Sequence, residues 1–428
     1  MQNLYERLLS SYDAHLNHSG VRGERVADRL YELSKIGSTE SGGTTRVGYS
    51  NEEKHAKMLI ISWMKEAGLA VETDGAGNVF GRLEGKRPGA SIMSGSHVDS
   101  VPNGGHFDGP LGVLAALEVV ESWKEQGYTP EMPYTVAIFS DEEGSRFKSG
   151  LTGSRAFMGE ITPDELDSLR DEEGKTFSEV IEAYGSTVED FFKAGKKEKQ
   201  IEMFVEVHIE QGKQLEKADQ PVGIVSGIAG PAWLEITFTG EAGHAGNTPM
   251  TDRKDPLVAA GIFLQSVEGL PKQVSSTAVA TVGKLHVQPN GVNVIPKQVE
   301  MIVDIRDIQE DTRDQLLNLI TEMAKDIGDK RQVEVDAKIT TKISPLPIHQ
   351  ALQDKLAKAL EAVGISPIYI PSGAGHDAMI MGQEFPVAML FVRSKDGISH
   401  TPSEWTSLND CVSAVHVLKS FIQDFMEA

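Results

Sequence analysis

The chain has 428 residues, and its 41 Lys and Arg against 63 Asp and Glu give a formal net charge of −22. This length exceeds one ordinary domain, and 39% apolar with 24% charged residues is typical of a globular chain, which excludes extensive disorder. Nucleic acids and anionic membranes are bound by clustered basic residues, so we expect neither as a partner. An anionic small substrate needs only a local positive group and stays possible.

The cysteine content and the absence of long apolar runs indicate the compartment. Cys411 is the single cysteine, so no intrachain disulfide can form, as is typical of a reducing compartment. Residues 409–412 follow a helical pattern, and we expect a structural role for this thiol. The N-terminal segment lacks the apolar core of a signal peptide, and no run approaches the ~20 apolar residues of a membrane span. We therefore expect a cytoplasmic protein.

Four short apolar runs separated by helical patterns predict buried strands: 91–96, 135–140, 203–209 and 386–392. One of the helical patterns spans 111–126. Strands alternating with helices predict an α/β fold, with a mostly parallel central sheet flanked by helices.

Histidine or carboxylate side chains accompany the end of each predicted strand: His97, Asp141–Glu143, His208 and, after a short loop, His400. Ligands of parallel sheets bind beyond the carboxyl ends of the strands. We therefore expect these polar side chains to share one edge of the sheet.

The middle of the chain has a different pattern, with longer and more regularly alternating strands predicted at 277–285, 297–306 and 331–343. Helical patterns lie between them at 256–268 and 311–327. The sequence predicts an inserted, smaller α+β domain at 221–343. Residues 1–220 and 344–428 would then form one discontinuous catalytic domain.

The stretch GSHVDSVPNGGHFDGPLGV, residues 95–113, concentrates two His, two Asp and five Gly in one loop. It lacks the Gly-Lys-Ser/Thr ending of a phosphate-binding loop, and no G-x-S-x-G motif indicates a serine nucleophile. His97 and Asp108 are residue types that bind zinc or manganese, and the glycines let the backbone turn back between them. Asp99 lies on the same side of an extended chain as His97 and is suited to accept its second ring N–H.

Each of these groups has an ordinary structural explanation when it is taken alone. Asp108 with Gly109 is typical of a turn, and Asp141–Glu143 of the acidic first turn of a helix. His208 could be a half-buried strand residue, and residues 399–402 a turn. Chance alone rarely brings all of them to one sheet edge, so the sequence favours a metal site.

The motifs then match a known family. The chain resembles M20-type dinuclear metallohydrolases of the amidase/hydantoinase/carbamoylase branch over nearly its whole length. The motifs that carry the resemblance follow in family order: GSHVDSVPNGGHFDGPLGV, FSDEEGSRF, VEVHIEQG, GEAGHAGNTPM, GVNVIP, DIRD, SGAGHDAM and ISHTPSE.

The resemblance implies two divalent metal ions per subunit, zinc or manganese first, with cobalt or nickel also suited to these ligands. The implied ligands are His97 and His208 for one ion, Glu143 and His400 for the other, and Asp108 as the bridge. Glu142 would be the general base and Asp99 the partner of His97. The inserted domain would be a lid and dimerisation domain, so the resemblance also implies a homodimer.

The implied substrate-binding residues come from both parts of the chain: Gln211, His244, Asn293, Arg306, Gly373 and His376. His244 would also act in catalysis, on the developing oxyanion. Arg306 would bind a substrate carboxylate, although pairing with Asp304 or Asp307 explains an arginine at a strand end equally well.

Within the branch, residues 107–113 and 150–157 are more similar to N-carbamoyl-L-amino-acid hydrolases. The implied reaction hydrolyses the carbamoyl group of an N-carbamoyl-L-amino acid to the L-amino acid, ammonia and carbon dioxide. Allantoate or 3-ureidopropionate are alternative substrates for the same polar site. A metal-binding oligomerisation module without catalysis is a further alternative, against which the retained Glu142 argues.

Overall fold

The computed structural model describes residues 3–195 and 200–427. Contacts along the chain divide it into two compact units. The first comprises Met1–Val225, Ile348–Ile370 and His376–Ala428, and the second comprises Ser226–Pro347 and Pro371–Gly375. Within the described ranges, no helix is long and apolar enough to cross a membrane.

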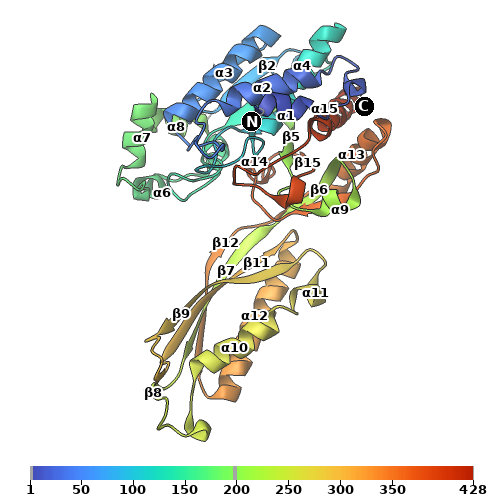
Figure 1. The fold of residues 1–428 in the computed structure, drawn as a ribbon. Coiled ribbons are helices and arrows are strands. Elements are labelled where there is room, and N and C mark those ends of the chain that lie inside the picture. Colours follow the sequence, from blue (N-terminus) through green and yellow to red (C-terminus); the bar gives the residue numbers. More distant parts are fainter. Residues whose placement is uncertain (1–2, 196–199, 428) are drawn as a thin grey trace. The chain divides into compact units, whose positions relative to one another are not determined.

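The first unit is built on a sheet with the strand order β1-β2-β4-β3-β5-β15-β6. Figure 1 labels β2, β5, β15 and β6 of this sheet. The strands are β1 (Ala70–Thr73), β2 (Val79–Leu83), β3 (Ser91–His97), β4 (Tyr134–Phe139), β5 (Ile201–Ile209), β6 (Val222–Ile228) and β15 (Val387–Val392). The four central strands β4, β3, β5 and β15 are mutually parallel and correspond to the four predicted runs. β1, β2 and β6 pair antiparallel at the sides. The mixed α/β class with a mostly parallel sheet is confirmed.

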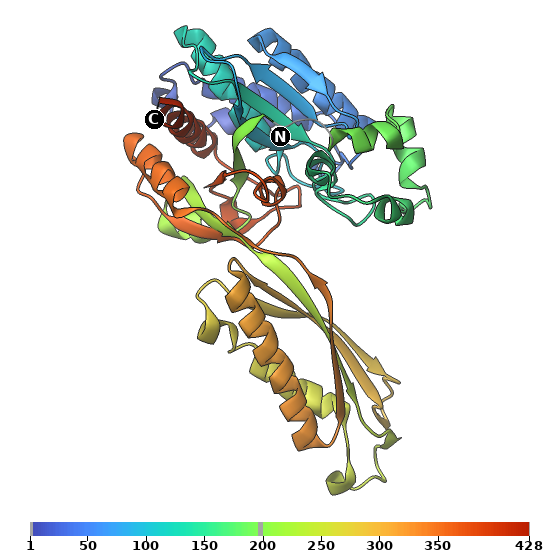
Figure 2. The ribbon, with the colours of Figure 1, turned by 180° about the vertical axis from the view of Figure 1, so that it is seen from behind.

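Helices flank this sheet, as Figure 2 shows from behind. They are α1 (Leu4–Leu9), α2 (Gly23–Ser34), α3 (Asn51–Ala67), α4 (Pro110–Gln126), α5 (Thr152–Met158), α6 (Pro163–Ser168), α7 (Phe177–Tyr184), α8 (Val188–Ala194), α9 (Gln214–Ala218), α13 (Gln350–Ala362), α14 (Asp377–Met381) and α15 (Leu408–Glu427).

Among these helices, α4 is the most central, because it packs on β3 and β5 and is itself covered by α15 and α2. It starts with a proline in its first turn and stops at Gly127 in the left-handed conformation, which are the signals that favour a helix start and end. Cys411 is fully buried in α15, which agrees with the helix predicted around it.

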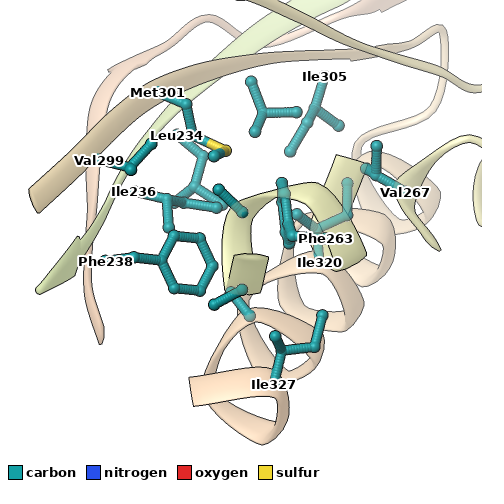
Figure 3. Close-up of a cluster of buried hydrophobic side chains, with 14 of the residues drawn as sticks. Leu234, Ile236, Phe238, Phe263, Val267, Val299, Met301, Ile305, Ile320 and Ile327 are labelled. Carbon is teal, nitrogen blue, oxygen red and sulfur yellow. The ribbon is translucent and has the colours of Figure 1, made fainter. Parts of the chain in front are cut away.

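The second unit contains a sheet of order β12-β7-β11-β9. Its strands are β7 (Gly230–Thr239), β9 (Val279–Gln288), β11 (Gln298–Asp307) and β12 (Glu334–Lys342), and its helices are α10 (Pro256–Val267), α11 (Pro271–Val274) and α12 (Glu310–Arg331). Alternate residues of β7 and β11 are buried, the period-two pattern of a sheet with one covered face. Figure 3 shows this core, in which Phe238 and Ile236 face Phe263 of α10 and Ile320 of α12.

Shorter elements complete the two units. β8 (Gly243–His244) pairs with β10 (Val294–Ile295), while β13 (Leu346–Pro347) and β14 (Tyr369–Ser372) pair with β6. Single 3-10 turns lie at Ala14–Leu16, Met250–Asp252 and Lys395–Gly397. The predicted strands and helices of the middle region correspond to β9, β11, β12, α10 and α12. β7 was not predicted.

Candidate metal centre

The candidate site lies at the carboxyl ends of the four central strands of the first unit. His97 is the last residue of β3, and His208 is the last but one of β5. Asp141–Glu143 follow β4 after Ser140, and His400 lies in the loop after β15. Because these strands are neighbours and run parallel, the structure brings their polar side chains to one edge.

The first cluster consists of His97, Asp108 and His208, whose ligand atoms lie within 4.8 Å of one another. Asp108 Oδ1 is 3.1 Å from His208 Nε2 and 3.6 Å from His97 Nε2. All three residues are buried, and among the described residues His97 Nε2 finds no hydrogen-bond partner. A buried polar atom without a partner is uncommon, and here it faces a carboxylate and a second imidazole, so it fits a metal ligand.

Backbone carbonyls fix the orientation of both imidazoles. His97 Nδ1 lies 3.1 Å from the carbonyl oxygen of Asp99, and His208 Nδ1 lies 3.0 Å from that of Ile209. A carbonyl oxygen only accepts, so each Nδ1 carries the proton and donates it. The lone pairs of both Nε2 atoms are therefore left for the cluster.

The carboxylate of Asp99 also makes hydrogen bonds that the sequence did not indicate. Its carboxylate, predicted to accept from His97, lies 3.4 Å from Nδ1, farther than its own backbone oxygen. Its two oxygens instead accept the backbone N–H groups of Glu142 and Glu143, each at 3.1 Å. Asp99 thus holds the loop that carries the glutamate pair against β3.

The second cluster consists of Asp108, Glu143 and His400. His400 Nε2 is 3.4 Å from Asp108 Oδ2 and 3.4 Å from Glu143 Oε2. Asp108 therefore turns one oxygen to each cluster, as a bridging carboxylate does. His400 differs from the ligands of the first cluster, because 48% of its side chain is exposed and its backbone is left-handed with φ +58°.

Two glycines make room for this arrangement. A Cβ atom at Gly109 would lie 2.5 Å from the imidazole of His97, and Gly109 has φ +83°. A Cβ atom at Gly105 would lie 2.1 Å from the carboxyl group of Glu404. The predicted role of these glycines was to turn the chain back. The structure adds a close approach of neighbouring side chains that only glycine permits.

Glu142 stands beside the first cluster, with Oε2 3.6 Å from His97 Nε2. The stretch from Asp141 to Gly150 is described throughout and contains no helix start, since α5 begins at Thr152. The alternative that Asp141–Glu143 are first-turn acids of a helix is therefore wrong.

Burial and neighbouring charges shift the pKa values of these carboxyl groups in opposite directions. Burial raises the pKa of Glu142 well above its ordinary value, against the opposing effect of His97. Burial and then Asp108 raise the pKa of Glu143 to about 7. Burial alone would raise the pKa of Asp108, but His208, His400 and His97 outweigh it and hold this pKa well below its ordinary value. Carboxyl groups with divergent pKa values are typical of acid–base sites.

Two of the predicted substrate-binding residues contact the clusters. Gln211 donates its side-chain amide to Asp108 Oδ2 at 2.7 Å. The His376 ring is buried with its centroid 4.5 Å from that of His208, and burial followed by His208 holds the pKa of His376 well below its ordinary value. The lowered pKa favours a neutral ring, and His376 occupies the N-cap position of α14 without a side-chain capping hydrogen bond.

The remaining predicted residues belong to the second unit. Arg306 forms a two-point ion pair with Asp304 and donates to the Gly373 carbonyl at 2.6 Å, so the alternative pairing is present. His244 and Asn293 lie on the paired strands β8 and β10 or directly beside them, and both are exposed. His244 Nδ1 accepts the N–H groups of Gly246 and Asn247, so its proton sits on Nε2.

Three residues at the site were not predicted from the sequence. Glu404 and Ser399 lie within hydrogen-bond distance of Asp108 or its backbone, and Asp377 is fully buried with a pKa that burial raises to about 8. All three stand inside the quoted motifs ISHTPSE and SGAGHDAM. The available signal was the polar character of Ser399 and Asp377 next to His400 and His376, and of Glu404 four residues after His400.

Residues 93–424 match the model of peptidase family M20/M25/M40. The chain belongs to this family. It is 43% identical over 399 residues to the N-carbamoyl-L-amino acid amidohydrolase of Geobacillus stearothermophilus, which covers 93% of this chain and 97% of the relative. It is 34% identical to the allantoate amidohydrolase of Bacillus subtilis, over 93% and 96% of the two chains.

A solved structure has the same fold. An amidase of the hydantoinase/carbamoylase family from Burkholderia multivorans superposes with a TM-score of 0.87 at 35% identity, over 95% of this chain and 98% of that one. The resemblance inferred from the motifs is thereby confirmed. Hydrolase chemistry on linear amides is the activity that the M20 relatives share by name.

Proposed function

We propose that the protein hydrolyses the carbamoyl group of N-carbamoyl-L-amino acids and releases the L-amino acid, ammonia and carbon dioxide. The observation that carries this proposal is the 43% identity to an N-carbamoyl-L-amino acid amidohydrolase over nearly the whole chain. Two further relatives of that name are 40% and 37% identical. The two clusters that share Asp108 supply a donor set suited to this chemistry.

In this proposal, His97 and His208 would hold one divalent cation, Glu143 and His400 would hold the other, and Asp108 would offer one oxygen to each. The donor set is compatible with zinc or manganese, and also with cobalt or nickel. Such cations supply Lewis acidity, which a ureido carbon requires because two nitrogen atoms donate electrons into it.

The chain's own groups move the protons and position the substrate. Glu142 takes a proton from the attacking water and returns one to the departing nitrogen, a task suited to a buried carboxylate with a raised pKa. His244 donates its Nε2–H to the developing oxyanion, and Arg306 binds the substrate carboxylate. Gln211, Asn293, Gly373 and His376 provide the remaining polar contacts.

We propose further that residues 221–343 act as a lid and as the contact of a homodimer, while 1–220 and 344–428 carry the metal ligands. An exposed apolar strip on α10 supports the dimer, since Leu257, Val258 and Ile262 are 41%, 43% and 38% exposed. These residues lie opposite the buried Ala259, Ala260 and Phe263, so the helix has apolar side chains on both faces.

The experiment that tests the proposal measures ammonia released by the manganese- or zinc-loaded protein. N-carbamoyl-L-methionine, its D-enantiomer, 3-ureidopropionate and allantoate are compared side by side. Preference for the L-carbamoyl compound supports the proposal. Preference for allantoate, the substrate named for relatives at 34% identity, keeps the mechanism and replaces the substrate. Bound metal without turnover of any of the four favours a different amide substrate or a non-catalytic module.

A further inference from the structure

Glu404 connects the two loops that carry Asp108 and His400. It lies four residues after His400 and is only 2% exposed. Its Oε1 atom accepts the backbone N–H of Phe107 at 2.8 Å and that of Asp108 at 3.2 Å. One buried carboxyl oxygen therefore fixes the backbone of the proposed bridging ligand from a position almost 300 residues away in the chain.

The other oxygen of Glu404 reaches the side chain of Asp108 through a serine. Glu404 Oε2 is 2.9 Å from Ser399 Oγ, and Ser399 Oγ is 2.5 Å from Asp108 Oδ2. Oδ2 is the oxygen that faces His400. The backbone and the side chain of Asp108 are thus held by the same carboxyl group, directly and through Ser399.

The residues around the Glu404 side chain leave room for its carboxyl group. Gly105 lies against the carboxyl group of Glu404, where a Cβ atom would come within 2.1 Å of it. The next residue, Trp405, packs edge-on against Phe107 with ring centroids 5.7 Å apart, and the Arg7 guanidinium lies 3.7 Å from the Trp405 ring. Residues 399–405 and 105–108 therefore dock on each other around the Glu404 carboxyl group.

The two clusters differ in how much they depend on this docking. The imidazoles of the first cluster are buried and are held by carbonyl oxygens of their own strand ends. In the second cluster, His400 is half-exposed, and its loop is tied to Asp108 through Glu404 and Ser399.

We propose that Glu404 is a positioning residue that sets the geometry of Asp108 and His400, and thereby the affinity of the second cluster for its cation. This inference rests on the metal ligands of the proposed function. Glu404 does not touch the reacting atoms. It acts through hydrogen bonds that a neutral amide of the same length also makes.

The test compares Glu404→Ala and Glu404→Gln in the full-length, chelator-stripped protein by calorimetric titration with Mn²⁺ and Zn²⁺. We expect Glu404→Ala to weaken one of two binding steps about 10- to 100-fold and the other by less than about threefold. Glu404→Gln keeps both acceptor contacts and the link to Ser399, and we expect affinities within about threefold of the unchanged protein.

A matched control separates positioning from loss of stability. Asp307 in the second unit is also a fully buried carboxylate that accepts a backbone N–H and threonine hydroxyls. Asp307→Ala should lower the melting temperature and leave both metal affinities unchanged. If Glu404→Ala does not fold, Glu404→Asp withdraws the carboxyl group from Phe107 and Asp108 with less loss of volume and should reproduce the weakened step.

Three results would overturn the inference: wild-type metal affinity in Glu404→Ala or Glu404→Asp, equal damage in Glu404→Gln and Glu404→Ala, or equal weakening of both steps. Failure of the unchanged protein to bind any divalent cation overturns the proposed function as well. Two tight sites in both the unchanged protein and the alanine variant would overturn the positioning role alone.

Discussion

Asp304 holds the guanidinium group of Arg306 in a two-point ion pair. Nε donates to Oδ1 at 2.9 Å and one terminal nitrogen donates to Oδ2 at 2.8 Å, while the other terminal nitrogen donates to the Gly373 carbonyl. The arginine side chain is still 32% exposed, so its remaining N–H bonds are accessible. The ion pair and the proposed binding of a carboxylate are compatible, because Asp304 sets the direction in which the free N–H groups point.

Arg306→Lys tests this role. Lysine keeps the charge but loses the planar fork, so we expect KM for an N-carbamoyl-L-amino acid to rise about 10- to 100-fold with little change in kcat. The control substrate is the corresponding carboxamide, which lacks the negative charge. An equal rise in KM for both compounds would remove Arg306 from the substrate site.

Glu142→Gln removes the proposed base and keeps the shape of the side chain. We expect kcat to fall about 100- to 10,000-fold, because a positioned general base contributes a factor of that order. Metal content, measured on the purified protein by mass spectrometry, should not change. Glu143→Gln is the matched control and should lose metal. Turnover close to normal in Glu142→Gln contradicts the assignment.

Gly109→Ala introduces a methyl group against the imidazole of His97. The close approach of 2.5 Å and the positive φ of Gly109 together predict displacement of that ligand, with a loss of about 1–3 kcal/mol in stability from strain alone. Calorimetry should show weaker metal binding. Gly269→Ala meets no atom within 4 Å and should alter the free energy of unfolding by less than about 0.5 kcal/mol. Metal affinity unchanged by Gly109→Ala is the contrary result.

Ile262→Asp places a charge in the exposed apolar strip of α10. If this strip is the dimer contact, the variant should be a monomer, because an uncompensated buried carboxylate opposes association. Light scattering after size-exclusion chromatography gives the mass. Asn318→Asp adds the same charge to α12 and should remain a dimer. A dimer of Ile262→Asp would place the interface elsewhere.

His416 predicts a pH-dependent contribution to stability. Burial lowers its pKa from 6.5 to about 4, and its ring stacks on that of His18 and donates to the Leu16 carbonyl at 2.9 Å. The unfolded chain therefore takes up a proton near pH 6.5 that the folded chain takes up only near pH 4. Stability is present above pH 6.5 and is lost as the pH falls toward 4.

The expected loss at His416 between pH 7 and pH 5 is about 1–2 kcal/mol, less than the full linkage value because this range crosses only part of the interval between the two pKa values. Thermal melts from pH 7 to 5 should therefore fall more steeply for the unchanged protein than for His416→Gln, which keeps an N–H donor. His15→Gln replaces an exposed histidine and should follow the unchanged protein. Parallel curves for all three proteins would contradict the expectation.

The central strands were predictable because each is a short apolar run bounded by polar residues. β7 has an equally clear alternation, yet it follows β6 after only Ala229 and begins with Gly230 and Pro231, which are residues typical of a turn and not of a strand. β1 is short and mostly exposed, and therefore lacks an apolar signal. The family motifs still identified the residues of the site, because a motif depends on the order of residues in the chain and not on where strands begin and end.

The contacts that organise the site were not predictable from residue types. Asp99 accepts two backbone N–H groups, and so does Glu404, but backbone donors leave no pattern in a sequence. The reason for glycine at positions 105 and 109 lies in side chains that approach from elsewhere in the fold. Arg306 had two explanations in the sequence, and only the structure shows that its pairing with Asp304 leaves part of the side chain accessible.

The place of β15 between β5 and β6 has a consequence for how the chain is made. These two strands precede β15 by more than 150 residues, and they are not neighbours in the sheet until Val387–Val392 fill the gap. During synthesis, β5 and β6 therefore each have an edge whose backbone hydrogen-bonding groups are unpaired, and such edges are prone to pair with a wrong strand. A nascent chain also lacks His400 until after β15 has been made, so neither the sheet nor the second cluster can form before that point.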